Sequence, residues 1–546
     1  MTDVPTNTSA TVANYATLNP LMAGTPFQTN AAATVSQGNL QADWGTTSQG
    51  SLLSTIAMTS GKWYFEGTVT GTNTREVIGI VNSSAATNTY AGGDANGWGY
   101  FSVNGNKYNN GSATSYGATY TTNDIIGVAF DADAGSLTFY KNNVSQGTAF
   151  TGLASGTYFF AVSDANSSLA CGWNVNFGQR PFAYTPPTGF VALNTYNLPT
   201  PTILQGNKYM DATLYTGTRT TNVIVNQGQF KPDAIWIKTR SAGAYNHHLV
   251  DSVRGANKNL RPNVTGAEDT TTDQVTAFNS NGFSLGVDTA GPADSEVNVN
   301  GNTYVAWQWQ AGQGTTSSNT QGSITSTVSV NTTAGFSIVT YTGTGSTKTF
   351  GHGLGVTPAM FIIKSRSQTG ENWVTWHKSF SNTAQGNMAL NTTDAVSNSA
   401  SVWGNTAPTS TLITVGNSAV NNNTSTYVCY AFAEISGYSK FGSFVGNSST
   451  NGPFVYCGFR PRYILFKNTT NYDWHVFDAA RNAYNYTNSS LKPDTSGAEY
   501  TNNDVSVDFL SNGFKLTGTD LAINGPSHTI IFAAFAEHPF KNSNAR

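Results

Sequence analysis

Residues 230–238 (FKPDAIWIK) govern how the C-terminal two-thirds of the chain is interpreted, because nearly the same stretch occurs three times. The other copies are residues 356–364 (VTPAMFIIK) and 459–467 (FRPRYILFK). In each copy a Pro precedes a short apolar and aromatic run, which ends in a Lys six positions after the Pro. A run that is opened by Pro and too short for a helix predicts a strand buried on both faces. We expect the Lys to return the chain to water.

Other features repeat with the same order. A closing strand is expected at residues 303–309 (TYVAWQW), 426–433 (TYVCYAFA) and 529–536 (TIIFAAFA). The hairpin signal SNGF occurs at residues 280–283 and 511–514 but not in the middle copy. Each copy is therefore expected to be a small antiparallel β-domain whose opening and closing strands are central and buried.

These spacings predict an all-β chain in four parts. The parts are residues 1–200, 201–312, 313–440 and 441–546. Pro199 and Pro201 indicate a stiff connection between the first part and the repeats. Residues 311–333 are low in complexity, and we interpret them as a linker or as an extended polar strand.

The first part shows short alternating runs separated by Gly, Asn, Asp and Ser, which is typical of an antiparallel sandwich. Five of its motifs resemble the SPRY domain in order and content: GKWYFE (61–66), GWGYFSVNGNKYNNG (97–111), DIIGVAF (124–130), LTFYKNNVSQG (137–147) and VNFG (175–178). The resemblance covers about residues 12–200 and implies a bent two-sheet β-sandwich that binds partners through its loops. SPRY domains are not enzymes as a class. Asn143 stands where the family often has Gly, but Asn tolerates positive φ.

The three repeats resemble the β-modules of unknown function that follow SPRY domains in marine phage structural proteins. This resemblance implies a phage virion protein that is assembled in the host cytoplasm. No basic n-region followed by an apolar segment opens the sequence, so we expect no signal peptide.

The composition excludes several classes of partner. Charged residues make up 10% of the chain and the formal net charge is −3, with no basic block, which disfavours nucleic acid as a ligand. No apolar run approaches the length of a membrane span, so no membrane insertion is expected. The three cysteines, Cys171, Cys429 and Cys457, have no CxxC spacing and are expected to be buried thiols.

A His-Asp-Arg set with identical spacing occurs in the first and third repeats. Its members are His248, Asp251, Arg254, His475, Asp478 and Arg481. General acid–base chemistry is one interpretation, but recurrence beside the same strands favours structural locks built on an Asp–Arg pair. The middle repeat keeps Trp376-His377 and has Phe380, which we align with the Asp position.

Aromatic residues among Asn, Gly and Thr are the candidate ligand-binding groups, because sugar binders combine stacking rings with amides. The candidates are Trp98, Tyr100, Tyr108, Trp373, Trp376 and Trp474. The alternative is that each ring caps a small core. Neither a cofactor nor a metal site is expected, because His247-His248 is the only adjacent His pair and its members point to opposite faces of a strand.

These observations predict a tail fibre or similar phage appendage that adheres to a host surface glycan or protein and contacts other virion proteins. Fibres are commonly trimers, so a homotrimer is expected. A capsid decoration or capsid fibre protein is an alternative. A polysaccharide-degrading tailspike is another, and it would require two converging carboxylates. Glu434 and Glu537 end equivalent closing strands in separate repeats, which favours a repeated feature over a catalytic pair.

Overall fold

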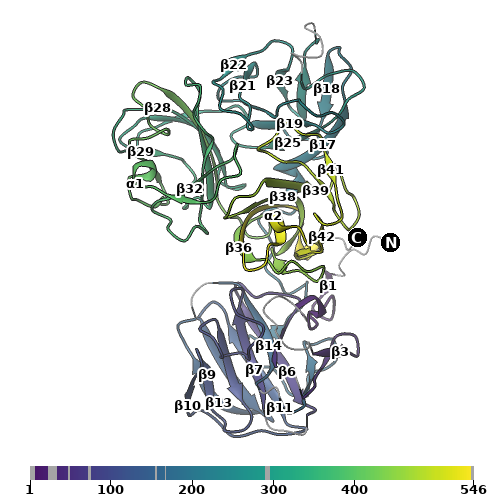
Figure 1. Ribbon diagram of the computed structural model, residues 1–546. Coiled ribbons are helices and arrows are strands. Elements are labelled where there is room, and N and C mark those ends of the chain that lie inside the picture. The colour runs from purple at the N-terminus through teal and green to yellow at the C-terminus, as the bar shows by residue number, and fades with distance from the viewer. Residues whose placement is uncertain are drawn as a thin grey trace. The chain divides into compact units, whose positions relative to one another are not determined.

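A computed structural model describes residues 7–22, 33–46, 49–71, 75–153, 156–165, 168–288 and 296–542. The all-β prediction is confirmed, because helices in these ranges are single turns: η1 (Pro20–Met22), η2 (Gly206–Lys208), α1 (Ala400–Trp403), α2 (Leu521–Asn524) and η3 (Phe540–Asn542). No helix in the described ranges is long and apolar enough to cross a membrane. The chain divides into two compact units, Thr2–Thr200 and Pro201–Arg546 (Figure 1).

The first unit contains two antiparallel sheets that pack as a sandwich. One sheet has the order β10 (Ser112–Thr114), β9 (Lys107–Asn109), β8 (Gly97–Phe101), β7 (Glu76–Asn82), β14 (Tyr158–Asp164), β5 (Gly50–Leu53). The other has the order β13 (Val144–Phe150), β12 (Ser136–Lys141), β11 (Ile125–Asp131), β6 (Lys62–Val69), β15 (Cys171–Asn176), β4 (Gln41–Trp44), β3 (Thr34–Ser36), and β16 (Val191–Ala192) pairs with β6. A short hairpin joins β1 (Asn7–Ser9) to β2 (Val12–Ala13). Phe65 of β6 meets Phe160 of β14 between the sheets, with ring centroids 4.2 Å apart.

The turn between β12 and β13 keeps its hairpin geometry without glycine. Lys141 pairs with Val144, so the loop has two residues, Asn142 and Asn143. Their φ angles are 45° and 70°, the left-handed values that such a turn requires and that Asn tolerates. The substitution of Gly by Asn therefore leaves the turn intact.

The second unit repeats one sheet three times, and Figure 1 shows the repeats in teal, green and yellow. We call residues 201–312, 313–438 and 439–546 repeats 1, 2 and 3, since the strand that opens the last repeat begins at Ser439 and not at the predicted boundary of 441. The sheet of repeat 1 has the order β17 (Met210–Thr216), β25 (Thr303–Trp309), β19 (Ala234–Thr239), β20 (His248–Asp251). That of repeat 2 has the order β26 (Ser317–Asn319), β27 (Ser326–Asn331), β28 (Phe336–Thr342), β35 (Thr426–Phe432), β30 (Met360–Ser365), β31 (Val374–His377), β32 (Gly386–Ala389), β33 (Ser397–Asn398). That of repeat 3 has the order β36 (Ser439–Val445), β44 (Thr529–Pro539), β38 (Phe459–Asn468), β39 (Trp474–Asp478).

Smaller sheets complete each repeat. Repeat 1 has β18 (Asn222–Val225), β24 (Gly282–Leu285) and β23 (Val275–Asn279), with the pair β21 (Lys258–Asn259) and β22 (Asp269–Thr270). Repeat 2 has β29 (Lys348–Gly351) and β34 (Leu412–Val415). Repeat 3 has β37 (Phe454–Tyr456), β43 (Gly513–Leu516) and β42 (Val507–Leu510), with the pair β40 (Ser489–Ser490) and β41 (Tyr500–Thr501). Of the two interpretations of residues 311–333, the extended strand holds for β27, which pairs with β28.

The opening strands β19, β30 and β38 are each paired on both sides and buried throughout, as the sequence predicts. The prediction for their terminal lysines is wrong. Lys238, Lys364 and Lys467 have exposed fractions of 1%, 0% and 0%. They do not return to water, because a neighbouring repeat covers each strand end.

The three repeats also share one core, so they are not separate small domains. Trp309, Phe432 and Phe535 occupy the same position in the three closing strands. Their ring centroids lie 6.2 Å (Trp309–Phe432), 6.0 Å (Trp309–Phe535) and 5.6 Å (Phe432–Phe535) apart. A small apolar cavity of about 40 Å³ lies beside them, and its lining comes from all three repeats. Each repeat therefore depends on the other two to bury one face of its main sheet.

Candidate functional site

The buried lysines show how the repeats are joined. Each ammonium donates to a backbone carbonyl of another repeat, in the cyclic order 1 to 3, 3 to 2 and 2 to 1. The accepting carbonyls are those of Ser496 (3.3 Å from Lys238), Thr393 (3.2 Å from Lys467) and Thr265 (3.2 Å from Lys364). A cyclic set of equivalent contacts means that the repeats form a closed ring. Burial lowers the pKa of each of the three lysines to about 8.

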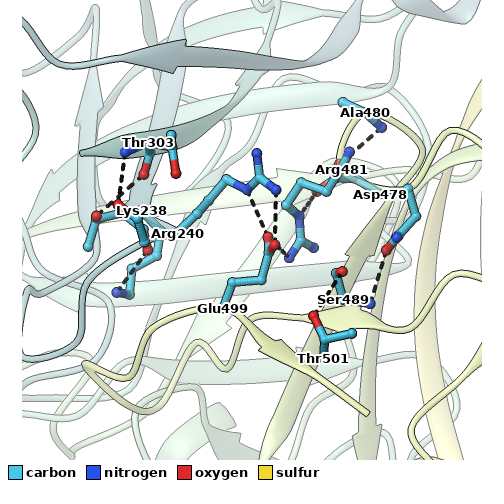
Figure 2. A network of polar contacts seen from close by, with 12 residues as sticks. Lys238, Arg240, Thr303, Asp478, Ala480, Arg481, Ser489, Glu499 and Thr501 are labelled. Carbon is cyan, nitrogen blue, oxygen red and sulfur yellow. Dashed lines mark hydrogen bonds and ion pairs between the residues drawn. The ribbon is translucent and has the colours of Figure 1, made fainter. Parts of the chain in front are cut away.

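The joint between repeats 1 and 3 is a charged network (Figure 2). Asp478 pairs with Arg481 (2.6 Å) and accepts the indole N–H of Trp307 (3.0 Å). Figure 2 shows Glu499 between Arg481 and Arg240, to which it is bound at 3.2 Å and 2.8 Å. Burial alone would raise the pKa of Asp478, but Arg481 holds it below its ordinary value. The pair therefore stays ionised inside the protein.

The joint between repeats 2 and 1 has the same chemistry. Asp251 pairs with Arg254, and both side chains are fully buried. Tyr430 of repeat 2 donates its O–H to the Asp251 carboxylate at 2.7 Å. Glu268 accepts from Arg254 (3.2 Å) and from Arg366 of repeat 2 (2.9 Å). In both joints a buried Asp–Arg pair thus connects one repeat to the next.

The third joint, between repeats 3 and 2, is neutral, and it corrects our alignment of the middle repeat. His377 pairs with Met360, and Met360 lies four positions before Lys364. Asp251 and Asp478 likewise pair with the residues four positions before the lysines of their own repeats, so His377 has the place of the aspartate. Phe380 therefore matches the Arg position and not the Asp position. The prediction matched His377 to His248 and His475, but Val374 has their place opposite the residue before the lysine, and His377 lies three residues further along.

His377 keeps one hydrogen bond of the missing aspartate and reverses the direction of the bond across the joint, without carrying a charge. Its Nδ1 accepts the backbone N–H of Ser379 (3.1 Å), and its Nε2 lies 3.2 Å from the carbonyl of Phe532 in repeat 3. Burial lowers the pKa of His377 to about 3, so the ring is neutral. Val396 replaces the bridging Glu, and its N–H donates to the carbonyl of Thr469 (3.0 Å). In this joint His377, Phe380 and Val396 thus replace all three charged residues, the Asp, the Arg and the bridging Glu.

The two predicted lock histidines lie beside the Asp–Arg pairs and make separate contacts. His248 bonds to Asn259 (3.1 Å) and Glu296 (2.6 Å). His475 bonds to the hydroxyl of Ser490 (2.8 Å). Burial lowers the pKa of His475 to about 3. Both histidines therefore brace the small two-stranded sheets of their own repeats.

Four of the six predicted aromatic ligand-binding residues are buried, so the prediction is wrong for them. They are Tyr100, Trp373, Trp376 and Trp474, with exposed fractions of 2% or less. Trp373 and Trp474 donate their indole N–H groups across joints of the ring, to the carbonyls of Arg261 (3.0 Å) and Ala389 (3.0 Å). An indole or phenol side chain that is enclosed in this way has no free face on which a ligand could stack.

The other two aromatic candidates, Trp98 and Tyr108, are half-buried in the first unit. Trp98 leans on Tyr158, with ring centroids 5.7 Å apart, and the Asn104 amide donates to the Tyr108 hydroxyl at 3.1 Å. An amide beside a partly exposed ring is the predicted arrangement. These two residues therefore remain candidates for ligand contact.

The two most exposed tyrosines of the described residues lie in repeat 3 with a third nearby, and the sequence prediction missed all three. Tyr484 is 76% exposed, Tyr486 49% and Tyr500 43%. Tyr484 and Tyr486 belong to the loop after β39, and Tyr500 lies on β41, which pairs with β40 at the end of that loop. We call this loop and strand, residues 482–488 and 500–503, the tyrosine rim.

The loop of the tyrosine rim is fixed at several points although its rings are exposed. The side-chain amide of Asn485 donates to the carbonyl of Phe509 (3.0 Å) and accepts its N–H (2.9 Å). The backbone N–H groups of Thr487 and Val507 bond to each other's carbonyls. Such anchoring lowers the conformational entropy lost on binding, because the loop is already ordered.

The loop of the tyrosine rim is longer than the corresponding loop of repeat 1. Seven residues separate Arg481 from Ser489, whereas three separate Arg254 from Lys258, its counterpart. The longer loop carries Tyr484 and Tyr486, and Asn and Thr residues surround them. Exposed rings beside neutral amides and hydroxyls can stack on apolar sugar faces and bond to sugar hydroxyls. Aligning the repeats would have revealed this insertion.

The carboxylates considered for catalysis are engaged in ion pairs. Glu434 is bound by Lys440 (2.8 Å) and by Lys378, and Glu537 is bound by Arg460. Within the described ranges no group of three or more His, Cys, Asp or Glu side chains is placed to hold a metal ion. The tyrosine rim is therefore the candidate site with the clearest binding chemistry.

Comparisons with known proteins identify both units. The family model described as "Domain of unknown function (DUF7483)" matches residues 205–539, and the SPRY domain model matches residues 62–180, which confirms the SPRY prediction. The ATP-dependent RNA helicase DDX1 of Xenopus laevis is 27% identical over 190 residues, which is 34% of this chain and 24% of that protein. The chain thus matches about a quarter of that relative's length.

Solved structures with similarity to the chain include SPRY domains. The SPRY domain of human HERC1 is 19% identical with a TM-score of 0.27, and the match covers 30% of this chain and 99% of that one. The TRIM65 PSpry domain is 16% identical with a TM-score of 0.25, and the match covers 30% and 92% of the two chains.

Proposed function

Since the chain belongs to the family described as "Domain of unknown function (DUF7483)", whose role is open, we propose that it is a binding protein of a phage virion. In this proposal it is a tail fibre or similar appendage that attaches to a neutral glycan on the host surface through the tyrosine rim. The observation that carries the proposal is the exposure of Tyr484 and Tyr486 on a loop whose backbone is anchored.

Electrostatics supports a neutral ligand. Asp478 and Asp251 are paired with arginines in the joints, and Lys492, whose ammonium lies 5.7 Å from the ring centroid of Tyr500, is paired with Asp473. The tyrosine rim itself carries Tyr, Asn, Thr and Ala, with Asp504 following it. A neutral polyhydroxyl chain can be held by stacking and hydrogen bonds without desolvating an ion.

The phage assignment rests on the resemblance of the repeats to modules in marine phage structural proteins. A capsid decoration or capsid fibre protein presents the same surface, and gold-labelled antibody on intact particles distinguishes these locations. The homotrimer stays a prediction, and sedimentation of the full chain tests it.

Binding of the full chain to a panel of bacterial surface polysaccharides tests the function. We expect retention on neutral polysaccharides that persists in high salt, because stacking is not screened. Release of reducing sugar during the assay would support the tailspike alternative. Retention only on anionic polymers, with loss in salt, would contradict the proposal.

A further inference from the structure

One pair of positions in the ring differs in chemistry among the repeats although its geometry is kept. In repeat 1 the Asn263 amide donates to the side-chain oxygen of Asn246 at 2.8 Å. In repeat 2 the Asn391 amide donates to the side-chain oxygen of Asn372 at the same distance. In both repeats the oxygen of the donating Asn also accepts the backbone N–H that follows the other Asn, at 2.9 Å and 2.8 Å. The side-chain amides of Asn263 and Asn391 thus each donate one hydrogen bond and accept another.

Repeat 3 has two aspartates at these positions. Asp494 matches the donating Asn, because its Oδ1 accepts the backbone N–H of Trp474 at 3.3 Å. Asp473 precedes Trp474 and matches the accepting Asn. The side chains of Asp494 and Asp473 face each other within hydrogen-bond reach. An ionised carboxylate only accepts hydrogen bonds, so it cannot donate as the amide does.

The other oxygen of Asp494 shows the consequence. Asp494 Oδ2 is buried and meets no N–H or O–H donor among the described residues. A proton on this oxygen would make it a donor to Asp473 and restore the hydrogen bond of the other repeats. Burial and the neighbouring Asp473 charge raise the pKa of Asp494 to about 7, which agrees with the geometry.

We propose that Asp494 and Asp473 share a proton and make repeat 3 the pH-sensitive part of the ring, which is stable below neutral pH and is weakened when both groups ionise. The ionised pair places two like charges where repeats 1 and 2 have a neutral amide pair. The inference stands on the equivalence of the repeats and does not depend on the proposed glycan binding.

Other charged groups face the pair and limit the effect. Lys492 bonds to Asp473 at 2.5 Å, and it also lies over the ring of Tyr500, 5.7 Å from its centroid. Lys467, His475, Asp394 and Asp520 are the other titratable groups that interact with the pair or with its lysines. Lys492 stabilises one negative charge at Asp473, which leaves Asp494 as the group that keeps the proton.

The sign of the pH dependence follows from the raised pKa. Between about pH 4 and pH 7 the folded protein holds a proton on Asp494 that the unfolded chain releases. Stability from this group is therefore full below pH 4, falls as pH rises to about 7, and stays low above it. An Asn at position 494 donates at every pH, so Asp494→Asn removes the effect.

Thermal unfolding of the full chain from pH 4.5 to pH 8 tests the proposal. We expect Tm of D494N to agree with that of the wild type within about 2 °C at pH 4.5 and to exceed it by about 3–6 °C at pH 8. Asp473→Asn removes the neighbouring charge but leaves Asp494 buried, so its profile is expected to lie between those of the wild type and D494N. Parallel profiles for the wild type and these variants would overturn the proposal.

A transplant into repeat 2 gives a second, independent measurement. The double variant Asn372→Asp/Asn391→Asp installs an acid pair where the wild type has amides. We expect Tm of this variant to fall more steeply than that of the wild type between pH 4.5 and pH 8. An unchanged slope would contradict proton sharing at this position, whether or not D494N folds.

Discussion

Tyr430 of repeat 2 donates its phenol O–H to the Asp251 carboxylate of repeat 1 across 2.7 Å, in a contact from which water is excluded. The same position in repeat 1 is Trp307, which contacts Asp478 of repeat 3. In repeat 3 it is Ala533, and the carbonyl of the preceding residue, Phe532, lies 3.2 Å from His377 Nε2 in the neutral joint. Three different residues therefore occupy one structural position, and the two large ones each donate to the buried aspartate of a neighbouring repeat.

The charged joints should be sensitive to the loss of one partner. Asp478→Asn removes the nearer, fully buried counterion of Arg481 and leaves only Glu499 at 3.2 Å, so we expect the free energy of unfolding to fall by about 3–5 kcal/mol. Urea unfolding followed by tryptophan fluorescence measures this change. Lys378→Met breaks a partly exposed ion pair with Glu434 and serves as the control, with an expected loss of about 1 kcal/mol or less. Equal losses in both variants would contradict the joint's role.

The neutral joint should reject a charge but accept a complete exchange. His377→Asp alone places a carboxylate among apolar groups without a cation, and we expect it to cost about 2–4 kcal/mol. Adding Phe380→Arg supplies the partner that Asp251 and Asp478 have. The double variant should therefore be more stable than H377D in urea unfolding. A double variant less stable than the single one would show that the two positions do not form a pair.

The buried lysines predict a gain of stability at alkaline pH. Burial lowers the pKa of Lys364 to about 8, so between about pH 8 and pH 10.5 the unfolded chain binds a proton that the folded protein has released. We expect the free energy of unfolding of the wild type, relative to Lys364→Met, to rise by about 1–3 kcal/mol across this range. Below pH 7 the difference should be constant. A difference that falls as pH rises would show that the ammonium form is the stable one.

The shared core predicts that the ring unfolds as one body. Phe535→Ala removes one of three rings that meet at the centre, and we expect a loss of about 3–5 kcal/mol. Because each repeat buries its sheet against the others, calorimetry should show one transition for residues 201–546 in both proteins. A separate transition for repeat 3 in the variant would mean that the repeats are independent domains.

The strands were predictable from sequence because their signal is local. A Pro followed by a short apolar run defines β19, β30 and β38 without knowledge of the fold. The burial of the lysines that end these strands was not predictable in this way. A single strand pattern does not tell whether water or a neighbouring repeat follows it, and here a carbonyl such as that of Ser496 receives Lys238.

The candidate site was harder to predict for a related reason. Trp373 and Trp474 have polar neighbours in sequence, as Tyr484 and Tyr486 do, yet the first two are covered by adjacent repeats. The types of residue next to an aromatic side chain in the sequence do not tell whether another repeat covers it. The length of the loop before Ser489, compared with that of repeat 1, is the sequence signal that marks the exposed pair.

Binding of the double variant Tyr484→Ala/Tyr486→Ala to the polysaccharide that retains the wild type tests the central claim most directly. Both rings are exposed, so Tm should change by less than about 1 °C. Trp98→Ala, in the first unit, is the matched aromatic control. We predict that affinity falls about 10- to 100-fold in the double variant, which corresponds to about 1.4–2.8 kcal/mol. Unchanged affinity in the double variant, with loss in W98A, would contradict the assignment of attachment to the tyrosine rim.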